Sequence, residues 1–179
     1  DFSLIRTAEK LDDPRQVEYL EVVLSGIEAD GKIPSDERQQ CAWENGALYC
    51  CINAEAQVPA PGACIAGAMN PYLRSSLAVP ASNARIHELA SSIMETMNDP
   101  QDRIQAILSW IEEYIEKEPV DVFSALDVLD KGKAECQGHA MLYAALARAS
   151  GIPTRVVNGI VYSAEHGGFL YHTWAESCV

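Results

Sequence analysis

The stretch CQGHAMLYAALARAS, residues 136 to 150, constrains the fold of this chain more than any other segment. It is an apolar run rich in alanine, and a helix with such small side chains lets a sheet approach closely. Gly151 and Pro153 follow it, as is typical of a helix end, so the pattern predicts a helix over residues 137–150. Cys136 then lies at or just before the first turn. There the free N–H groups and the helix dipole favour an anion and lower the pKa of a thiol.

Two amphipathic helices are predicted ahead of this one. Apolar residues recur at helical spacing after Ser82 and Asn83, either of which can cap the first helix. Asp99 caps the second helix with Pro100 at its first position, and we expect that helix to end at Pro119. Each helix carries one apolar stripe, so each predicts a face that packs onto a shared core.

A short helix and two strands complete this part of the chain. SALDVLDKG predicts a helix that Ser124 caps and Gly132 stops. TRVVNGIVY and FLYHTWAE are rich in β-branched and aromatic residues, which is typical of strands, and the short segment SAEHGG joins them. Helices followed by closely linked strands predict an α+β fold with an antiparallel sheet.

The region before residue 80 predicts β structure. Residues 17–54 alternate loosely between apolar and polar, and Asn45-Gly46 is a strong signal for a two-residue hairpin turn. Counting outward from that turn pairs Cys41 with Cys50 as a non-hydrogen-bonded pair, in which side chains approach most closely. A disulfide is geometrically possible there. Because cysteine is sparse in the chain, we expect two half-buried thiols instead.

The chain divides near Pro80 into two predicted domains. Residues 1–79 form a small β-rich region that ends in a loop over residues 56–71, where prolines and glycines are frequent. Residues 80–179 form the α+β core. A length of 179 residues is enough for one domain with such an appendage.

Charge excludes several classes of partner. Thirteen basic and twenty-six acidic residues give a net charge of −13, which repels phosphate backbones and anionic lipids. No apolar stretch reaches the roughly 18 residues of a membrane span. No C-x-x-C pair is present, so a structural zinc site has little support. The chain begins at Asp1 without methionine, so we expect a processed or cut product.

His172 is the candidate partner for the Cys136 thiol. It lies in a predicted strand between Tyr171 and Trp174, and a strand packed on the alanine-rich helix brings it towards the thiol. A Cys–His ion pair is the usual activated nucleophile of acyl transfer. The alternative is that both residues only contribute to packing. His139, one turn along the helix, is a second candidate base.

A metal site is a further alternative. Cys136, His139, His172 and Cys178 are suitable ligand types, but their spacing matches no recognised metal motif.

GKAECQGHAMLYAALARASGIPTRVVNGIVY followed by GGFLYHTWAES resembles the bacterial branch of the transglutaminase-like superfamily. That family has a nucleophile helix with Gly-x-x-Cys, an exit of Leu-x-Arg-x-x-Gly-Ile-Pro and a His-x-Trp-x-Glu strand. The resemblance covers roughly the last hundred residues. The matching residues are Cys136, His139, Ala140, Leu146, Arg148, Gly151, Ile152, Pro153, His172, Trp174 and Glu176.

The resemblance implies a papain-like core in which a nucleophile helix packs on an antiparallel sheet. It implies that Cys136 attacks an amide carbonyl of a protein or peptide, that His172 is general base and acid, and that no cofactor is needed. The thioester would then pass to an amine in transamidation, or to water in deamidation or peptide hydrolysis. One N–H of the oxyanion hole is expected at Cys136. The alternative function is a catalytically incomplete module used for binding or scaffolding.

The sequence departs from the family at the third catalytic residue. The family places an aspartate on the strand after the histidine strand, but only seven residues follow His172 here. Glu176 is roughly 13 Å along the same strand, too far to orient the imidazole. We therefore expect a chain truncated at its C-terminus, in which loss of the orienting group can cost about 10⁴ in rate. The family favours an exported or cell-envelope location. The oligomeric state stays open.

Overall fold

The computed structural model describes residues 4–26, 33, 35–56 and 70–179. It separates into two compact units. The first, here called the helical unit, comprises residues 1–5, 61–161 and 169–179. The second, the β unit, comprises residues 6–60 and 162–168. The predicted loop over residues 56–71 lies almost wholly outside the described residues.

The described residues of the helical unit form four α-helices, and the predicted caps are confirmed. Asn83 caps α1, Asp99 caps α2, and Ser124 caps α3, each by accepting a backbone N–H of the first turn. Gly132 ends α3 in the left-handed region with φ of 65°, where a glycine costs little. The helices are α1 (Ala84–Ile93), α2 (Pro100–Tyr114), α3 (Ala125–Lys131) and α4 (Cys136–Ala149).

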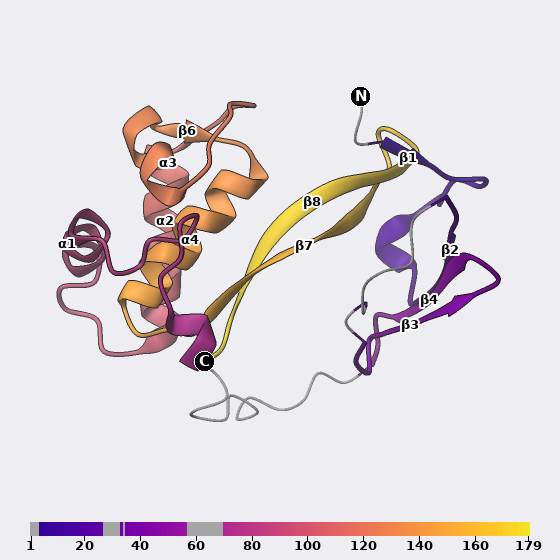
Figure 1. Ribbon diagram of the computed structural model, residues 1–179, viewed down its shortest axis with the longest axis horizontal. Coiled ribbons are helices and arrows are strands. Elements are labelled where there is room, and N and C mark those ends of the chain that lie inside the picture. Colours follow the sequence, from indigo (N-terminus) through magenta and orange to yellow (C-terminus); the bar gives the residue numbers. More distant parts are fainter. Residues whose placement is uncertain (1–3, 27–32, 34, 57–69) are drawn as a thin grey trace. The chain divides into compact units, whose positions relative to one another are not determined.

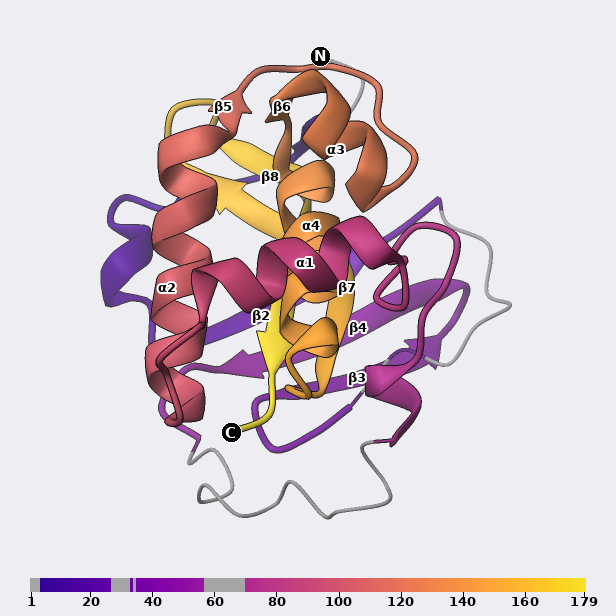
Figure 2. The same cartoon turned by 90° about the vertical axis from the view of Figure 1, so that its left-hand side faces the viewer.

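Helix α4 lies at the centre of this unit. It packs against α1, α2 and α3, and Figure 2 shows α1 crossing in front of it. Every residue from 140 to 147 is buried, as an alanine-rich helix with neighbours on several sides requires. Leu142 and Leu146 are completely buried at the heart of the core.

A long β-hairpin packs on the same helix. Strands β7 (Thr154–Ser163) and β8 (Gly168–Ser177) pair in a sheet of order β1-β8-β7, with β1 spanning Leu4–Arg6. Figure 1 shows this hairpin on the side of α4 that faces away from α1. Val156 and Ala175 pack against the helical core. The α+β class, with an antiparallel hairpin after the helices, is confirmed.

The predicted end of α2 is wrong. The helix ends at Tyr114, and Ile115 already has extended backbone, with φ of −117° and ψ of 112°. The cause is a tertiary pairing: β5 (Glu116–Lys117) runs parallel to β6 (Lys133–Ala134). These two-residue strands have no periodic pattern, so the sequence gives no sign of them.

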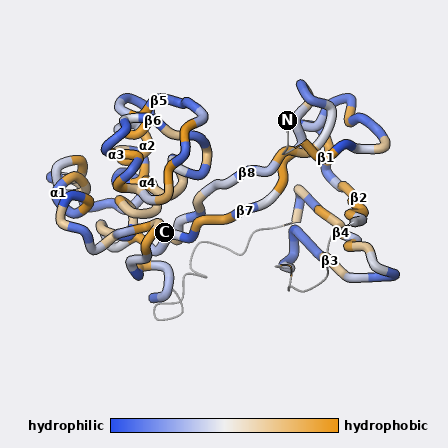
Figure 3. Tube along the Cα trace, turned by 45° about the horizontal axis from the view of Figure 1, so that its top comes forward, coloured by the Kyte–Doolittle hydropathy of each residue, from blue (hydrophilic) through white to orange (hydrophobic). Residues whose placement is uncertain are grey.

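The β unit contains a three-stranded antiparallel sheet of order β2-β4-β3. Its strands are β2 (Tyr19–Leu24), β3 (Gln39–Glu44) and β4 (Ala47–Asn53). A short 3₁₀ turn, Pro14–Gln16, also lies in this unit, whereas a second one, Asn70–Leu73, lies in the helical unit. The predicted hairpin turn is confirmed, with positive φ at Asn45 and Gly46. Figure 3 shows hydrophilic residues at its tip.

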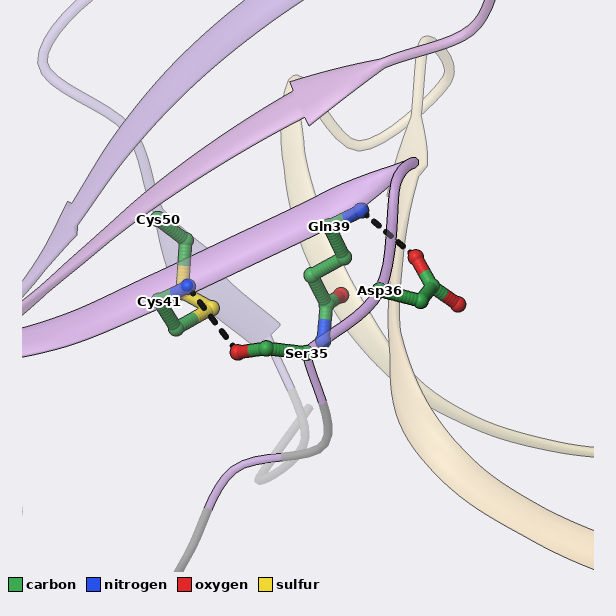
Figure 4. Close-up of a disulfide and its surroundings, with 5 residues drawn as sticks. All are labelled: Ser35, Asp36, Gln39, Cys41 and Cys50. Carbon is green, nitrogen blue, oxygen red and sulfur yellow. Dashed lines mark hydrogen bonds between the residues drawn. A yellow bond between two sulfur atoms is a disulfide. The ribbon is translucent and has the colours of Figure 1, made fainter. Parts of the chain in front are cut away.

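The hairpin register is the predicted one, but the cysteines in it are not free. Cys41 and Cys50 are direct partners and form a disulfide with a Cα–Cα distance of 4.1 Å. The Cys41 N–H donates to Ser35 Oγ at 3.3 Å rather than across the strand (Figure 4). This is the expected behaviour of a non-hydrogen-bonded pair, whose side chains lie closest. The expectation of two thiols is therefore wrong, because the register of the hairpin, and not the number of cysteines in the chain, decides whether this pair can bond.

Candidate active site

Cys136 is the first residue of α4, and its half-buried side chain is a free thiol. The residue before it, Glu135, occupies the N-cap position but its side chain makes no capping hydrogen bond. The other three α-helices all have a side-chain cap. The first-turn N–H groups of α4 therefore have no carboxylate or hydroxyl cap and lie where an anion is stabilised.

Close packing fixes the start of α4. A Cβ built on Gly138 would lie 2.4 Å from the Cβ of Ala134 and 2.8 Å from Cγ2 of Val122. Only a glycine allows α4 to approach β6 and the segment before α3 this closely. The sequence ECQGHA thus places Cys136 on a rigid helix start, two residues from a tightly packed contact.

His139 lies one turn after Cys136. Its Nδ1 is 2.9 Å from the backbone carbonyl of Glu135. A carbonyl oxygen can only accept, so Nδ1 carries the proton in this arrangement and Nε2 is the nitrogen left for other partners. The hydrogen bond ties the ring to its own helix, where it is less able to reach a substrate lying across from α4.

His172 lies in β8 and is half-buried. Its ring stacks on Trp174, with 6.4 Å between ring centroids and 21° between ring planes. Strand alternation places His172 and Trp174 on the face of β8 opposite to Thr173 and Ala175, which face the core. One face of β8 therefore packs on the core, and the opposite face carries the candidate catalytic histidine.

The structure brings the two predicted catalytic residues into one unit. Both lie in the helical unit, and Figures 1 and 2 both show β8 passing beside the N-terminal half of α4. Within the described residues, no hydrogen bond or ion pair joins Cys136 to His172. The pairing of these two side chains is thus not made in this state of the protein.

Glu176 is engaged by other groups. Its Oε2 is 2.6 Å from Nη2 of Arg155, and its Oε1 accepts the indole N–H of Trp174 at 3.0 Å. The hydrogen bond that Arg155 donates to Glu176 raises the pKa of the guanidinium. In the part of the chain that the structure describes, no carboxylate accepts a hydrogen bond from His172.

Arg155 and Gly159 were not among the predicted site residues. Both lie in β7, across from the histidine strand. An isolated glycine inside a strand pattern often marks a close approach, which was the available signal for Gly159. Nothing in the sequence pattern relates Arg155 to Glu176, because cross-strand register is set by the fold.

Other polar and aromatic residues lie apart from these groups. His87 and His166 are exposed. Trp110 stacks on Tyr114 at 5.1 Å between ring centroids, with Tyr114 at the surface. Across the described ranges, no group of three or more His, Cys, Asp or Glu side chains is arranged to hold a metal ion. None of the helices described there is long and apolar enough to cross a membrane.

Comparison with solved structures shows the same fold in bacterial proteins. The chain resembles a "putative cysteine protease" from Cytophaga hutchinsonii, with 19% identity and a TM-score of 0.56 over 97% of this chain and 64% of that one. It also resembles the periplasmic domain of TgpA from Pseudomonas aeruginosa, with 17% identity and a TM-score of 0.56 over 98% and 67% of the two chains. The chain thus spans about two thirds of each neighbour.

A comparison with curated proteins finds no match. The family model for the transglutaminase-like superfamily matches residues 87–179, which include α2, α3, α4 and the whole β7–β8 hairpin. Together with the structural neighbours, this match supports a family of cysteine-dependent enzymes. The matched segment is more than half of the chain, and the chain belongs to the transglutaminase-like superfamily.

Proposed function

We propose that this protein is a cysteine-dependent acyl-transfer enzyme acting on protein or peptide amides. The Cys136 sulfur attacks the amide carbonyl, forming a C–S bond, and the C–N bond breaks. The thiol proton passes through the imidazole of His172 to the leaving amine. An incoming amine then cleaves the thioester in transamidation, whereas water cleaves it in deamidation or peptide hydrolysis.

The observation that carries this proposal is the state of Cys136. It is a free thiol at the start of the only α-helix of the described chain that lacks a side-chain cap. The uncapped N–H groups and the helix dipole stabilise a thiolate. The same groups can stabilise the negative oxygen that forms on the carbonyl during attack, with the N–H of Cys136 as one donor.

The assignment of His172 as base rests on its strand and its family motif. Residues 172, 174 and 176 match the family's His-x-Trp-x-Glu pattern, and β8 passes beside α4 (Figures 1 and 2). Catalysis requires the imidazole and the Cys136 sulfur to come within hydrogen-bond reach, which catalytic pairs often achieve only when substrate is bound. His139 is the weaker candidate because its Nδ1 is bonded to Glu135 of its own helix.

The alternative is a catalytically incomplete module used for binding. It is favoured by one observation: no described carboxylate accepts a hydrogen bond from His172, and Glu176 is bound to Arg155. Without an orienting group, a Cys–His pair works far below the rate of a complete triad.

The test is the pH dependence of alkylation at Cys136 by iodoacetamide, mapped by mass spectrometry. Cys51 is also a half-buried free thiol and serves as the reference in the same sample. We expect Cys136 to react well below pH 8.5, about the reference pKa of a thiol, and to lose this reactivity in His172→Ala but not in His139→Ala. If the pH profile of alkylation at Cys136 matches that of Cys51 and does not change in His172→Ala, the catalytic proposal is overturned and the binding module is favoured.

We also propose an exported or cell-envelope location. The disulfide between Cys41 and Cys50 supports it, because such bonds persist in oxidising compartments and are rare where thiols are kept reduced. Fractionation of the source cells tests it. Recovery of the protein with reduced Cys41 and Cys50 in the cytoplasmic fraction would contradict this location.

A further inference from the structure

We propose that Trp174, Glu176 and Arg155 are positioning residues that hold the imidazole of His172 in one orientation. This inference rests on the proposed function, in which His172 is the general base. The three side chains form a continuous series of contacts that starts on β7, crosses to β8 and ends at the histidine ring.

The series begins with a two-point ion pair. Arg155 contacts Oε2 of Glu176 through Nε at 2.7 Å and Nη2 at 2.6 Å. Both nitrogens contact the same oxygen, so the guanidinium fixes the position of Oε2 and leaves Oε1 for another donor. The other carboxylate oxygen then accepts the indole N–H of Trp174 at 3.0 Å. The last contact is the stack of Trp174 on His172, with 6.4 Å between the ring centroids.

Gly159 provides the surface on which the indole lies. A Cβ at this position would be 2.7 Å from Cη2 and 3.0 Å from Cζ3 of Trp174. The indole therefore lies directly over the backbone of β7, where any other residue would displace it. Trp174 is held by Gly159 beneath its ring, by Glu176 at its N–H, and by His172 beside it.

A fixed neighbour matters here because no hydrogen bond from the described residues restrains the ring of His172. No described side chain accepts a hydrogen bond from its ring, so its rotamer is set by packing. A stacked indole that cannot rotate removes alternative positions of the imidazole. Correct prior orientation of a catalytic group is worth large factors in rate, and a displacement of about 1 Å can cost 100-fold.

The charges of this network point to positioning rather than to a direct electrostatic effect. The carboxylate of Glu176 is neutralised by Arg155, so little net charge remains to act on the imidazole. Replacing Glu176 by glutamine should therefore keep only part of the function, because its single amide oxygen can accept the indole N–H while its NH₂ group cannot accept from Arg155. Replacing it by alanine removes both acceptors.

The test compares four variants by two measurements. Trp174→Phe keeps an aromatic ring but loses the N–H donor, Glu176→Ala loses the acceptor, and Gly159→Ala displaces the indole. Glu176→Gln is the conservative variant, which keeps one of the two acceptors. The first measurement is the rate of Cys136 alkylation at pH 6 to 7. The second is the χ1 rotamer of His172 from three-bond couplings in NMR, which does not depend on Cys136.

We expect Trp174→Phe, Glu176→Ala and Gly159→Ala to lower the alkylation rate by about 10-fold or more and to let His172 populate several rotamers. Glu176→Gln should lie between wild type and Glu176→Ala in both measurements, because it keeps an acceptor for the indole N–H but loses the ion pair with Arg155. Tyr171→Phe is the matched control, because it removes one hydrogen bond to Asn158 on the opposite face of the same strand. It should leave both measurements unchanged.

The two proposals fail in different ways. If His172→Ala abolishes the enhanced alkylation while Trp174→Phe leaves rate and rotamer at wild-type values, the positioning inference is overturned and the proposed function stands. If the alkylation rate of Cys136 does not change in His172→Ala but Trp174→Phe lets His172 populate several rotamers, the contact network is supported and its role in catalysis is overturned. Equal losses in Glu176→Gln and Glu176→Ala would contradict the orienting hydrogen bond.

Discussion

Gly138 is the residue on which the position of the candidate nucleophile depends. We predict that Gly138→Ala lowers the free energy of unfolding by about 1–3 kcal/mol, the usual cost of overpacking. Alanine is the better helix former by about 1 kcal/mol, but its Cβ would lie 2.4 Å from that of Ala134. Neither side chain has a flexible end that can move away, so the clash outweighs the propensity.

Urea unfolding followed by far-UV circular dichroism measures this effect. Gln137→Ala is the control, since the exposed neighbouring position should change stability by less than about 0.5 kcal/mol. A Gly138→Ala variant as stable as wild type would show that α4 does not approach β6 as closely as described.

Arg148 joins three segments through one guanidinium. Its Nε donates to the carbonyl of Thr154 at 2.8 Å and its Nη1 to the carbonyl of Arg74 at 2.7 Å. Burial lowers the pKa of this guanidinium. A lysine cannot reproduce the forked geometry, so we predict that Arg148→Lys lowers the free energy of unfolding by about 1.5–3 kcal/mol.

The matched control is Arg85→Lys. Arg85 pairs with Asp130 at 2.8 Å, but both side chains are more than half exposed. Exposed ion pairs contribute at most about 1 kcal/mol, so this substitution should have a much smaller effect in the same denaturation experiment. If Arg148→Lys and Arg85→Lys lowered the free energy of unfolding by the same amount, a special role for Arg148 would be contradicted.

At the scale of elements, a chain of three hydroxyl groups connects α4 to the hairpin. Tyr143 Oη is 2.7 Å from Ser177 Oγ, which is 2.8 Å from Thr154 Oγ1. Thr154 in turn donates to the carbonyl of Ile152 at 3.1 Å. These bonds fix the C-terminal end of β8 against the helix that carries Cys136, and so fix the direction in which β8 runs towards His172.

This contact predicts a pH dependence in the alkaline range. Burial raises the pKa of Tyr143 above its ordinary value of 10.0, although the hydrogen bond between Tyr143 and Ser177 lowers it in part. The folded state therefore favours the neutral phenol. Its contribution to stability is complete below pH 10 and is lost as the pH rises through the higher pKa of the folded state.

The measurement is the stability of wild type and Tyr143→Phe from pH 7 to 11. At pH 7 the variant should be less stable by about 1 kcal/mol, the value of one hydrogen bond. Above pH 10 this difference should shrink, because only wild type loses stability by ionising Tyr143. A constant difference across the range would show that the phenol is not held in its neutral form.

The elements that local chemistry specifies were predictable. Asn83, Asp99 and Ser124 each form the predicted cap, and Asn45-Gly46 sets a register that extends to Cys41 and Cys50. These features depend on neighbours in sequence. The β5–β6 pairing and the true end of α2 depend on residues far apart in sequence, so no local pattern contains them.

The candidate site likewise has one part that local sequence predicts and another that depends on residues far apart in sequence. The position of Cys136 at the start of α4 follows from the alanine-rich run, and the strand of His172 follows from its β-branched and aromatic residues. The contacts of Trp174 with Gly159, and of Glu176 with Arg155, depend on how two strands align. The absence of a side-chain cap at Glu135 is informative because each of the other three α-helices has one, and only the structure allows this comparison.

At the scale of the whole molecule, the question is whether the two compact units unfold together. The disulfide between Cys41 and Cys50 lies within the β unit alone. Closing this short loop restricts the unfolded chain, and its removal is expected to cost about 2–3 kcal/mol. If the units unfold separately, that loss will appear only in the unit that contains the bond.

We predict that Cys41→Ala/Cys50→Ala weakens hydrogen-exchange protection in β2, β3 and β4 and leaves α4 unchanged. A double variant is preferable to a reducing agent because Cys178, in the helical unit, is also disulfide-bonded. Cys51→Ala controls for loss of a thiol from the same sheet. An equal fall of protection in α4 would show one cooperative structure, and the stability of the candidate site would then depend on the β unit. Unchanged protection in α4 would mean that the helical unit maintains the candidate site by its own packing.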